Sequence, residues 1–433
     1  MNSLFTFPRG LQLVSLPWDY SSTDAATLLG ITDPGSLSMA TWEAARQRYR
    51  LYPDAPADRF RLGSGYWLNL SAAADLTTEG SPAVDPVEIP LSAGWNLIGC
   101  PYQGRIDFYT SQVRDADGVV YSLQQALSRG VIGSGLYSYV LGGYQTLGVM
   151  SQYTGYWLKA YQPCYLIVSA RVGTLAAGET RDATPKAEGG WLLSLKTSCA
   201  GLEDSSTFVG TARGATDGCD FGLDQAKPPV PGMGGYIYTA IDNGNWGQAA
   251  GDYAVDMRAV GQKSIWDLTV TTNQVGQKVR LTWGDLSALP NDVRPVLLDL
   301  DSGQSAYLRT CSVYEFTAAQ ASRRLRIVVE PSGTGVLTIS PLAASSTANG
   351  TAISYTLSQA ASVEVTISNI AGRVVRQAVT NQVQPAGQNT IFWDGRDRNG
   401  LSTPNGRYLV SIVGRTENGQ QARTIMPLQK VAH

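Results

Sequence analysis

The feature that most constrains the fold of this chain is an internal duplication in its first 170 residues. Two short boxes occur twice in the same order: GLQLVSLPW at 10–18 and GWNLIGCPY at 94–102, then GYWLNL at 65–70 and GYWLKA at 155–160. Boxes that recur in order indicate a repeated unit. Each box is short, aromatic or β-branched, and bounded by Gly or Pro, which is typical of a strand. We therefore predict two β-rich repeats, residues 1–86 and 87–170.

Between its two boxes, each repeat contains one stretch compatible with a short helix, at residues 38–47 and 120–129. A unit of this size buries little apolar surface alone, so we expect the two repeats to pack together. Segments that read G-W-N-L-I-G-x-P and then G-Y-W-L resemble a repeat of secreted and cell-surface bacterial proteins. The resemblance implies an exported protein and leaves the function of the repeat open.

The second box of each repeat supplies the candidate contact residues. Strand alternation places Tyr66 and Tyr156 on one face of their strands, and Trp67 and Trp157 on the other face, beside the more polar residue of the box. One interpretation is that these aromatic side chains contact a ligand or a neighbouring subunit from an exposed surface. The alternative is that the adjoining repeat or the short helix covers both Trp side chains. We favour this second interpretation because large aromatic side chains are usually buried.

Residues 171–334 are predicted to form a β-sandwich. The segment begins with a linker-like stretch rich in Gly, Ala and Thr, and about eight short β-type runs follow with turn signals between them. The sequence ATDGCDFGLD at 215–224, followed by YAVDMR at 253–258 and by Trp266, is similar to the penultimate β-sandwich of cargo proteins of the bacterial type IX secretion route. This resemblance also implies a secreted protein.

The same segment contains the candidate metal and disulfide residues. Asp217, Asp220 and Asp224 lie close together in the sequence, and Ca²⁺ prefers several oxygen ligands from one loop. Because their spacing is not that of an EF-hand, solvated turn carboxylates are the favoured interpretation and Ca²⁺ is the weaker one; we expect no other cofactor. A disulfide between Cys199 and Cys219 would close a loop of about twenty residues and contribute about 3 kcal/mol. Buried free thiols fit the sequence equally well.

Residues 335–433 have the clearest strand pattern in the chain. Val363, Val365 and Ile367 alternate with polar residues, and seven β-type runs predict an immunoglobulin-like sandwich. The sequence TIFWDGRDRNG at 390–400 resembles the immunoglobulin-like domain of the flagellar hook-capping protein, and its acidic residues are predicted to form Asx turns. The fold class expected for the chain is mainly β, with tandem β-sandwich and immunoglobulin-like domains preceded by a duplicated β-rich unit with short helices.

Charge and residue types exclude several functions. Thirty-three basic and thirty-five acidic residues give a net charge of −2, without the basic cluster of a nucleic-acid binder. The single histidine is His433, which leaves no His-based catalysis or metal site in the interior. No apolar stretch of roughly 18 residues predicts a membrane span, and the first residues lack a signal-peptide pattern. No catalytic motif occurs, so we expect no enzymatic activity.

The sequence therefore predicts a non-enzymatic extracellular structural protein of the bacterial cell surface. We expect it to self-associate as a building block of a surface layer, sheath or filament, with other copies of itself or neighbouring surface proteins as partners. The alternative is a carbohydrate-binding adhesin that uses exposed Trp and Tyr side chains of the repeats, in which case glycans are the ligands.

Overall fold

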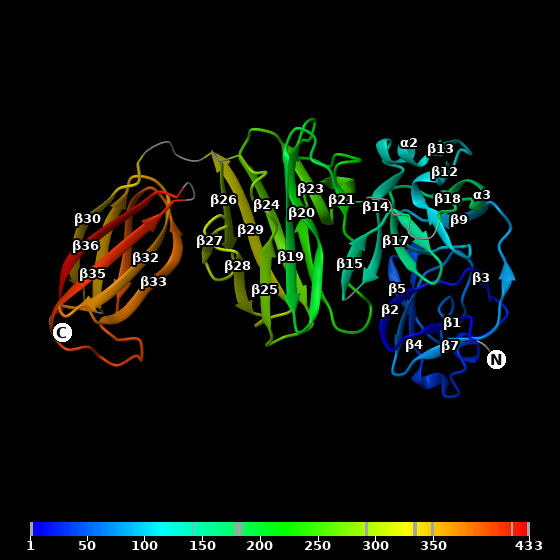
Figure 1. The fold of residues 1–433 in the computed structure, drawn as a ribbon, viewed down its shortest axis with the longest axis horizontal. Helices are drawn as coiled ribbons and strands as arrows, with labels where there is room; N and C mark the ends of the chain where they lie inside the picture. The colour runs from blue at the N-terminus through cyan, green and yellow to red at the C-terminus, as the bar shows by residue number, and fades with distance from the viewer. Residues whose placement is uncertain are drawn as a thin grey trace. The chain divides into compact units, whose positions relative to one another are not determined.

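The computed structural model describes residues 3–140, 142–176, 179, 183, 185–290, 293–331, 336–347, 350–416 and 419–430, and His433 lies outside this set. The fold is mainly β (Figure 1), as the sequence predicts. The chain divides into two compact units. Unit 1 contains Met1–Val260, Leu268–Gly284 and Glu315–Arg323, and unit 2 contains Gly261–Asp267, Asp285–Tyr314 and Arg324–His433. No helix among the described residues is long and apolar enough to cross a membrane.

The first repeat consists of short strands and one helical turn. These are β1 (Phe5–Phe7), β2 (Gly10–Val14), β3 (Trp18–Asp19), α1 (Ala25–Leu28), β4 (Ser38–Glu43), β5 (Arg48–Leu51), β6 (Tyr66–Leu70), β7 (Ala74–Leu76) and β8 (Ser81–Pro82). Four strands form a sheet in the order β2-β6-β4-β5. The predicted helix at 38–47 is wrong, because that stretch forms β4 and a 3₁₀ turn at Ala44–Arg46. Pairing of β4 with β5 and β6 overrides a weak helical propensity.

The second repeat has more regular strands and a better-defined helix. Its elements are β9 (Val87–Leu91), β10 (Gly94–Gly99), β11 (Arg105–Asp107), β12 (Gln112–Asp115), β13 (Val120–Ser122), α2 (Leu123–Ser128), β14 (Ile132–Val140), β15 (Gly143–Thr146), β16 (Val149–Ser151), β17 (Gly155–Ala160), β18 (Cys164–Val168) and α3 (Ala170–Gly173). A capping box formed by Ser122 and Gln125 starts α2. The helix predicted at 120–129 is therefore confirmed over Leu123–Ser128, whereas its first three residues form β13.

The main sheets of the two repeats have matching strand orders, β2-β6-β4-β5 in the first and β10-β17-β14-β15 in the second. In both repeats the first box pairs antiparallel with the second box, so that Leu13 lies opposite Trp67 and Leu97 lies opposite Trp157. Each repeat also has a cluster of buried apolar residues of its own. The duplicated sequence boxes thus occupy equivalent strands, the first box at one end of each sheet and the second box on the central strand beside it.

At glycines of the boxes, the backbones of the two repeats come into direct contact. The backbone nitrogen of Gly65 donates a hydrogen bond to the carbonyl oxygen of Leu97 at 3.1 Å. A Cβ atom on Gly65 would lie 2.6 Å from the carbonyl oxygen of Ile98, and one on Gly155 would lie 2.7 Å from that of Val14. Because no other residue lacks a Cβ atom, only glycine allows this approach of backbone to backbone.

The middle segment is built from longer strands. They are β19 (Trp191–Cys199), β20 (Leu202–Ala212), β21 (Gln225–Ala226), β22 (Ile237–Asp242), β23 (Asp252–Ala259), β24 (Ser264–Thr272), β25 (Lys278–Trp283), β26 (Val293–Asp299), β27 (Ser305–Tyr307), β28 (Val313–Thr317) and β29 (Ser322–Pro331). Within unit 1, strands follow the order β22-β23-β20-β19-β25, and within unit 2 the order is β27-β26-β29. Alternate residues of β19 are buried, as expected for a strand with one face on the core.

The C-terminal segment is a sandwich of two sheets, ordered β30-β31-β34 and β33-β32-β35-β36. Its strands are β30 (Ile339–Thr347), β31 (Gly350–Leu357), β32 (Ala361–Asn369), β33 (Val374–Gln384), β34 (Gly387–Trp393), β35 (Gly406–Arg415) and β36 (Gln421–Lys430). The apolar residues of β32 are completely buried, which confirms the predicted alternation. Asp397 forms the predicted Asx turn, because its Oδ1 accepts hydrogen bonds from the backbone nitrogens of Asn399 and Leu401 at 2.8 and 2.9 Å.

Candidate functional site

The four aromatic residues considered as contact residues lie inside unit 1, which confirms the favoured interpretation that the two Trp side chains are covered. Trp67, Trp157 and Tyr156 are 0% exposed, and Tyr66 is 1% exposed. Their side chains therefore cannot stack on a ligand or a neighbouring subunit, and the interpretation that they are exposed is wrong. The physical reason is that β6 and β17 are central strands: the Tyr side chains face the core of their own repeat, and the Trp side chains face the other repeat.

Each of these Trp side chains packs against aromatic residues of the other repeat. The ring of Trp67 lies 4.8 Å from that of Tyr139, and the ring of Trp157 lies 5.2 Å from that of Trp42, both edge to face. This geometry is the preferred one for aromatic pairs. The rings form two groups, one of Trp42, Tyr49, Trp95, Tyr137 and Trp157 and one of Trp67, Tyr139 and Tyr144. We call the two groups together the aromatic seam.

A proline-rich segment, residues 228–232, lies against the aromatic seam. The hydroxyl of Tyr49 donates a hydrogen bond to the carbonyl oxygen of Val230 at 2.8 Å, and the hydroxyl of Tyr144 donates one to that of Pro229 at 2.5 Å. The two Tyr residues occupy β5 and β15, the matching edge strands of the two repeats. Burial raises the pKa of both hydroxyls, so both remain donors. Each repeat thus donates one hydrogen bond to the proline-rich segment.

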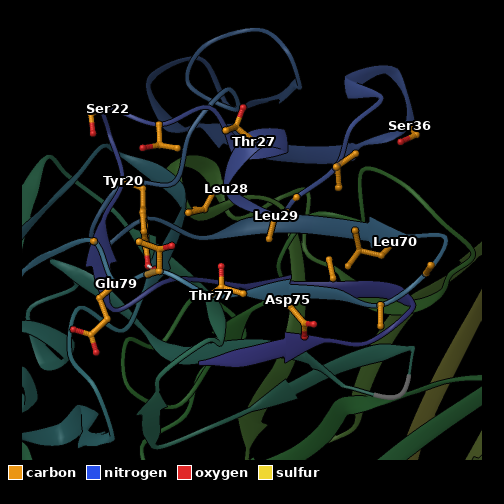
Figure 2. Close-up of a pocket in the computed structure, with 18 of the residues that line it drawn as sticks. Tyr20, Ser22, Thr27, Leu28, Leu29, Ser36, Leu70, Asp75, Thr77 and Glu79 are labelled. Carbon is orange, nitrogen blue, oxygen red and sulfur yellow. Dashed lines mark hydrogen bonds between the residues drawn. The ribbon is translucent and has the colours of Figure 1, made fainter. Parts of the chain in front are cut away.

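A polar hollow of about 800 Å³ lies on the first repeat. Figure 2 shows Thr27 and Leu28 from α1 on one side of it, and Asp75 and Thr77 from the β7 region on the other. The hydroxyl of Tyr20 donates a hydrogen bond to the carbonyl oxygen of Thr78 at 2.6 Å. Burial raises the pKa of Tyr20 to about 12, so this hydroxyl stays neutral at neutral pH.

Two of the acidic residues that line the hollow, Asp19 and Asp75, accept local hydrogen bonds, and Glu79 lines it as well. The carboxylate of Asp75 accepts from the hydroxyl of Ser3 at 3.2 Å, and the carboxylate of Asp19 accepts from the hydroxyl of Ser21 at 2.6 Å. The hollow therefore offers hydroxyls and hydrogen-bond acceptors, which suit a polar, uncharged ligand. No sequence motif marks it, because its lining comes from segments that are separated in the chain, at residues 19–36 and 70–81.

Asp217, Asp220 and Asp224 do not converge on one point. The side chain of Asp217 is 82% exposed, whereas Asp224 is buried and its carboxylate accepts from the backbone nitrogens of Asp220 at 2.7 Å and Met257 at 2.8 Å. The carboxylate of Asp220 accepts from the backbone nitrogen of Thr216, as in a turn. Within the described ranges, no group of three or more His, Cys, Asp or Glu residues is placed to hold a metal ion. The described residues thus give no support to the Ca²⁺ interpretation, and the favoured interpretation of solvated turn carboxylates fits Asp217 but is wrong for the buried Asp224.

All five cysteines are free thiols, so of the two interpretations of Cys199 and Cys219 the disulfide is wrong and free thiols are present. The two residues have different neighbours. Cys199 ends β19 opposite Leu202, whereas the Sγ atom of Cys219 accepts a hydrogen bond from the hydroxyl of Tyr253 at 3.6 Å. Burial raises the pKa of both thiols, which keeps them protonated and unreactive at neutral pH.

One buried ion pair in the middle segment is not marked by any sequence motif. The Nζ atom of Lys227 lies 2.7 Å from Oδ2 of Asp204, and the two side chains are 0% and 1% exposed. Burial lowers the pKa of Lys227. The only feature of the sequence near this ion pair is that Lys227 immediately precedes the proline-rich segment 228–232. The pairing with Asp204 follows from the fold alone.

The C-terminal domain of unit 2 exposes apolar side chains around a hollow of about 620 Å³. Ile370 is 76% exposed, Leu401 is 65% exposed and Val374 is 52% exposed. Ile370 and Val374 flank the turn between β32 and β33, and Leu401 belongs to the loop before β35. We call these three residues the apolar patch. Exposed apolar side chains that gather in one place tend to mark contact surfaces.

Comparison with known proteins supports the assignment of the C-terminal segment. Among solved structures, one match is the tetra-tandem repeat in the extending region of a large adhesion protein, with 12% identity, 92% of each chain covered and a TM-score of 0.15; a TM-score of this size does not show a shared fold. No curated protein matches the chain. Residues 340–418 match the family described as the FlgD Ig-like domain. The C-terminal segment is thus an immunoglobulin-like domain similar to that family, which confirms the resemblance predicted for it.

Proposed function

We propose that this protein is a non-enzymatic extracellular structural protein that self-associates as a building block of a cell-surface layer, sheath or filament. The observation that carries the proposal is the apolar patch formed by Ile370, Val374 and Leu401, which are more than half exposed. In water these side chains gain free energy when a partner covers them, at roughly 25 cal/mol per Å². The partner that we propose is a second copy of the chain.

The organisation of the chain supports a role that depends on surfaces. In unit 1 the aromatic seam buries the Trp side chains of the repeats, and in unit 2 the immunoglobulin-like domain buries Trp393 against Tyr408. Large aromatic side chains in edge-to-face contact make a closely packed and stable core. Such a core suits a protein whose function is to present fixed outer faces.

Sedimentation velocity over a range of protein concentrations tests the proposal. We expect the wild-type protein to associate with increasing concentration, and the double variant Ile370→Asp, Leu401→Asp to remain monomeric because it places charges in the contact. The matched control is Val172→Asp in α3, which changes a side chain that is 70% exposed and lies outside the patch. A wild-type protein that stays monomeric at the highest concentration, or a double variant that associates like wild type, contradicts the proposal.

A second candidate function is carbohydrate binding at the polar hollow of the first repeat. The specific observation in its favour is the combination of a volume of about 800 Å³ with hydroxyl and carboxylate groups along the wall, because saccharides bind through many hydrogen bonds. The buried Trp67 and Trp157 have no part in this version of the adhesin hypothesis.

A glycan array followed by calorimetric titration tests the second candidate. We expect Thr27→Leu together with Thr77→Leu to abolish binding of any glycan that the array identifies, since both side chains line the hollow. The double variant of the apolar patch serves as the control and should bind the glycan normally. An array without hits removes this candidate and leaves self-association untouched.

A further inference from the structure

Asp204 and Lys227 are the starting point, because the fold removes both of their charges from water. The Nζ atom of Lys227 lies 2.7 Å from Oδ2 and 3.0 Å from Oδ1 of Asp204. The side chains are 1% and 0% exposed, and the aromatic ring of Tyr238 lies 5.2 Å from Nζ. Burial lowers the pKa of Lys227, which favours the neutral amine. A neutral, desolvated lysine amine is a nucleophile.

A β-bulge brings the reacting groups together. Leu195 of β19 lies opposite Thr207 of β20, and Thr197 of β19 lies opposite Asp204 of β20. Between these two pairs β19 has one residue and β20 has two, so β20 has one extra residue at this point. Such a bulge redirects side chains that would otherwise point to opposite faces of the sheet. As a result, the hydroxyl of Thr207 accepts a hydrogen bond from Nζ of Lys227 at 2.8 Å. This bond orients the amine beside the carboxyl group.

Hydrogen-bond donors also surround the carboxyl group of Asp204. Its Oδ1 atom accepts from the backbone nitrogen of Ser206 at 3.1 Å and from the Ser206 hydroxyl at 2.9 Å. Its Oδ2 atom accepts from the backbone nitrogen of Thr239 at 2.8 Å. Fixed donors of this kind stabilise an oxyanion in a buried site. The arrangement therefore resembles the environment of an acyl-transfer step, although each donor also satisfies the resting carboxylate.

We propose that Lys227 and Asp204 condense to form an intramolecular amide bond between Nζ and Cγ. A proton first moves from the ammonium group to Oδ2, which leaves a neutral amine and a neutral carboxylic acid. The amine lone pair then attacks Cγ, and the negative charge that develops on Oδ1 is held by the donors of Ser206. A second proton moves from Nζ to Oδ2, the bond from Cγ to Oδ2 breaks, and Oδ2 leaves as water. No redox partner or other co-reactant is consumed.

Burial distinguishes this pair from a neighbouring lysine–carboxylate pair in the same hairpin. Lys196 and Glu203 are 2.6 Å apart, but their side chains are 50% and 39% exposed, so both charged groups remain in contact with water. The amide bond would attach β20 to the residue that precedes the proline-rich segment 228–232. Because Tyr49 and Tyr144 bind that segment, the bond would tie the middle segment to the aromatic seam.

Intact-protein mass spectrometry of the full chain tests the proposal directly. We expect the measured mass to be lower than the mass calculated from the sequence by one water molecule. Lys227→Met should restore the calculated mass, whereas Lys196→Met, which removes the exposed pair of the same hairpin, should keep the deficit. A wild-type protein that is folded by circular dichroism and has the full calculated mass overturns the proposal and shows an ordinary ion pair.

Fragmentation of peptides must locate the bond, because an aspartyl-glycine succinimide, for example at Asp217-Gly218, also loses one water. The tryptic peptides 197–213 and 214–258 are adjacent, so their cross-linked pair has the same mass as the peptide that results when trypsin misses Arg213. Fragment ions that join Asp204 to Lys227 support the proposal. A deficit that maps to Asp217, or that persists in Lys227→Met, overturns it.

A refolding experiment covers the case in which Lys227→Met does not fold. Wild-type chain that is recovered unfolded from inclusion bodies in urea should have the full calculated mass, because its amine is solvated. On removal of urea, the mass should fall by one water molecule as the fold brings the two groups together. A refolded chain, folded by circular dichroism, that keeps its full mass contradicts the proposal without the use of any variant.

Discussion

The aromatic seam of the repeats and the core of the immunoglobulin-like domain both depend on a buried Trp, but they differ in where the partners of that Trp lie. Trp157 packs at 5.2 Å on Trp42 of the other repeat, whereas Trp393 packs at 5.2 Å on Tyr408 of its own domain. The repeats are therefore halves of one packed structure, and the immunoglobulin-like domain completes its core with its own strands. A boundary in sequence similarity need not be a boundary of folding.

Substitution of the two Trp residues is expected to have the largest effect. Trp157→Ala should destabilise unit 1 by about 3–5 kcal/mol, because a buried indole leaves a large cavity. Trp393→Ala should destabilise the immunoglobulin-like domain by a similar amount. Chemical denaturation followed by fluorescence and circular dichroism should show each variant shifting a different transition. If both variants shift the same transition, the comparison between two separate cores fails.

Substitution of the crossing glycine should have the next largest effect. Gly155→Ala places a Cβ atom 2.7 Å from the carbonyl oxygen of Val14, so the backbones must separate, at a cost of about 1–3 kcal/mol. At Gly218, a Cβ atom would lie 3.6 Å from the nearest side-chain atom, and Gly218→Ala is the matched control. Equal unfolding midpoints for the two variants would show that the repeats are not in close contact at the boxes.

The free energy of unfolding of unit 1 should depend on pH because of the carboxyl group of Asp224. Burial outweighs its two backbone hydrogen bonds and raises the pKa of this carboxyl to about 8, whereas in the unfolded chain the pKa is near 4. Between these values the folded form binds one more proton than the unfolded form, so the free energy of unfolding falls as the pH rises from about 4 to about 8, by at most about 1.4 kcal/mol per pH unit. Thermal melting should show this slope in wild type and a flatter profile in Asp224→Asn. An unchanged slope in that variant would assign it to another group.

The tyrosine contacts with the proline-rich segment should have the smallest effect. Tyr49→Phe and Tyr144→Phe each remove one hydrogen bond to a backbone carbonyl, which corresponds to about 1 kcal/mol. Because the two residues are equivalent in the two repeats, we expect similar losses for both. Tyr165→Phe, at a position that is 38% exposed, should leave the denaturation midpoint of unit 1 unchanged and is the control.

The sequence alone was sufficient to predict the features that depend on residues close together in the chain. Alternation in β32, the Asx turn at Asp397 and the mainly β fold were all predicted, because each depends on residues within a few positions of one another. The helix prediction for 38–47 was wrong for the opposite reason, and the sequence could not decide between a disulfide and free thiols for Cys199 and Cys219, or between Ca²⁺ ligands and turn carboxylates at 217–224, for the same reason. A strand between two partners, the separation of two thiols and the directions of three carboxylates depend on segments that are distant in the chain.

The sequence by itself determined the period of the strands, the positions of the turns and the presence of two matching boxes, because these follow from the backbone preferences and the polarity of adjacent residues. Only the tertiary structure decided which residues of the opposite repeat pack on Trp67 and Trp157, and that Lys227 meets Asp204 in the interior. Whether a side chain is exposed depends on what packs against it, and the residues that bury these side chains lie far from them along the chain.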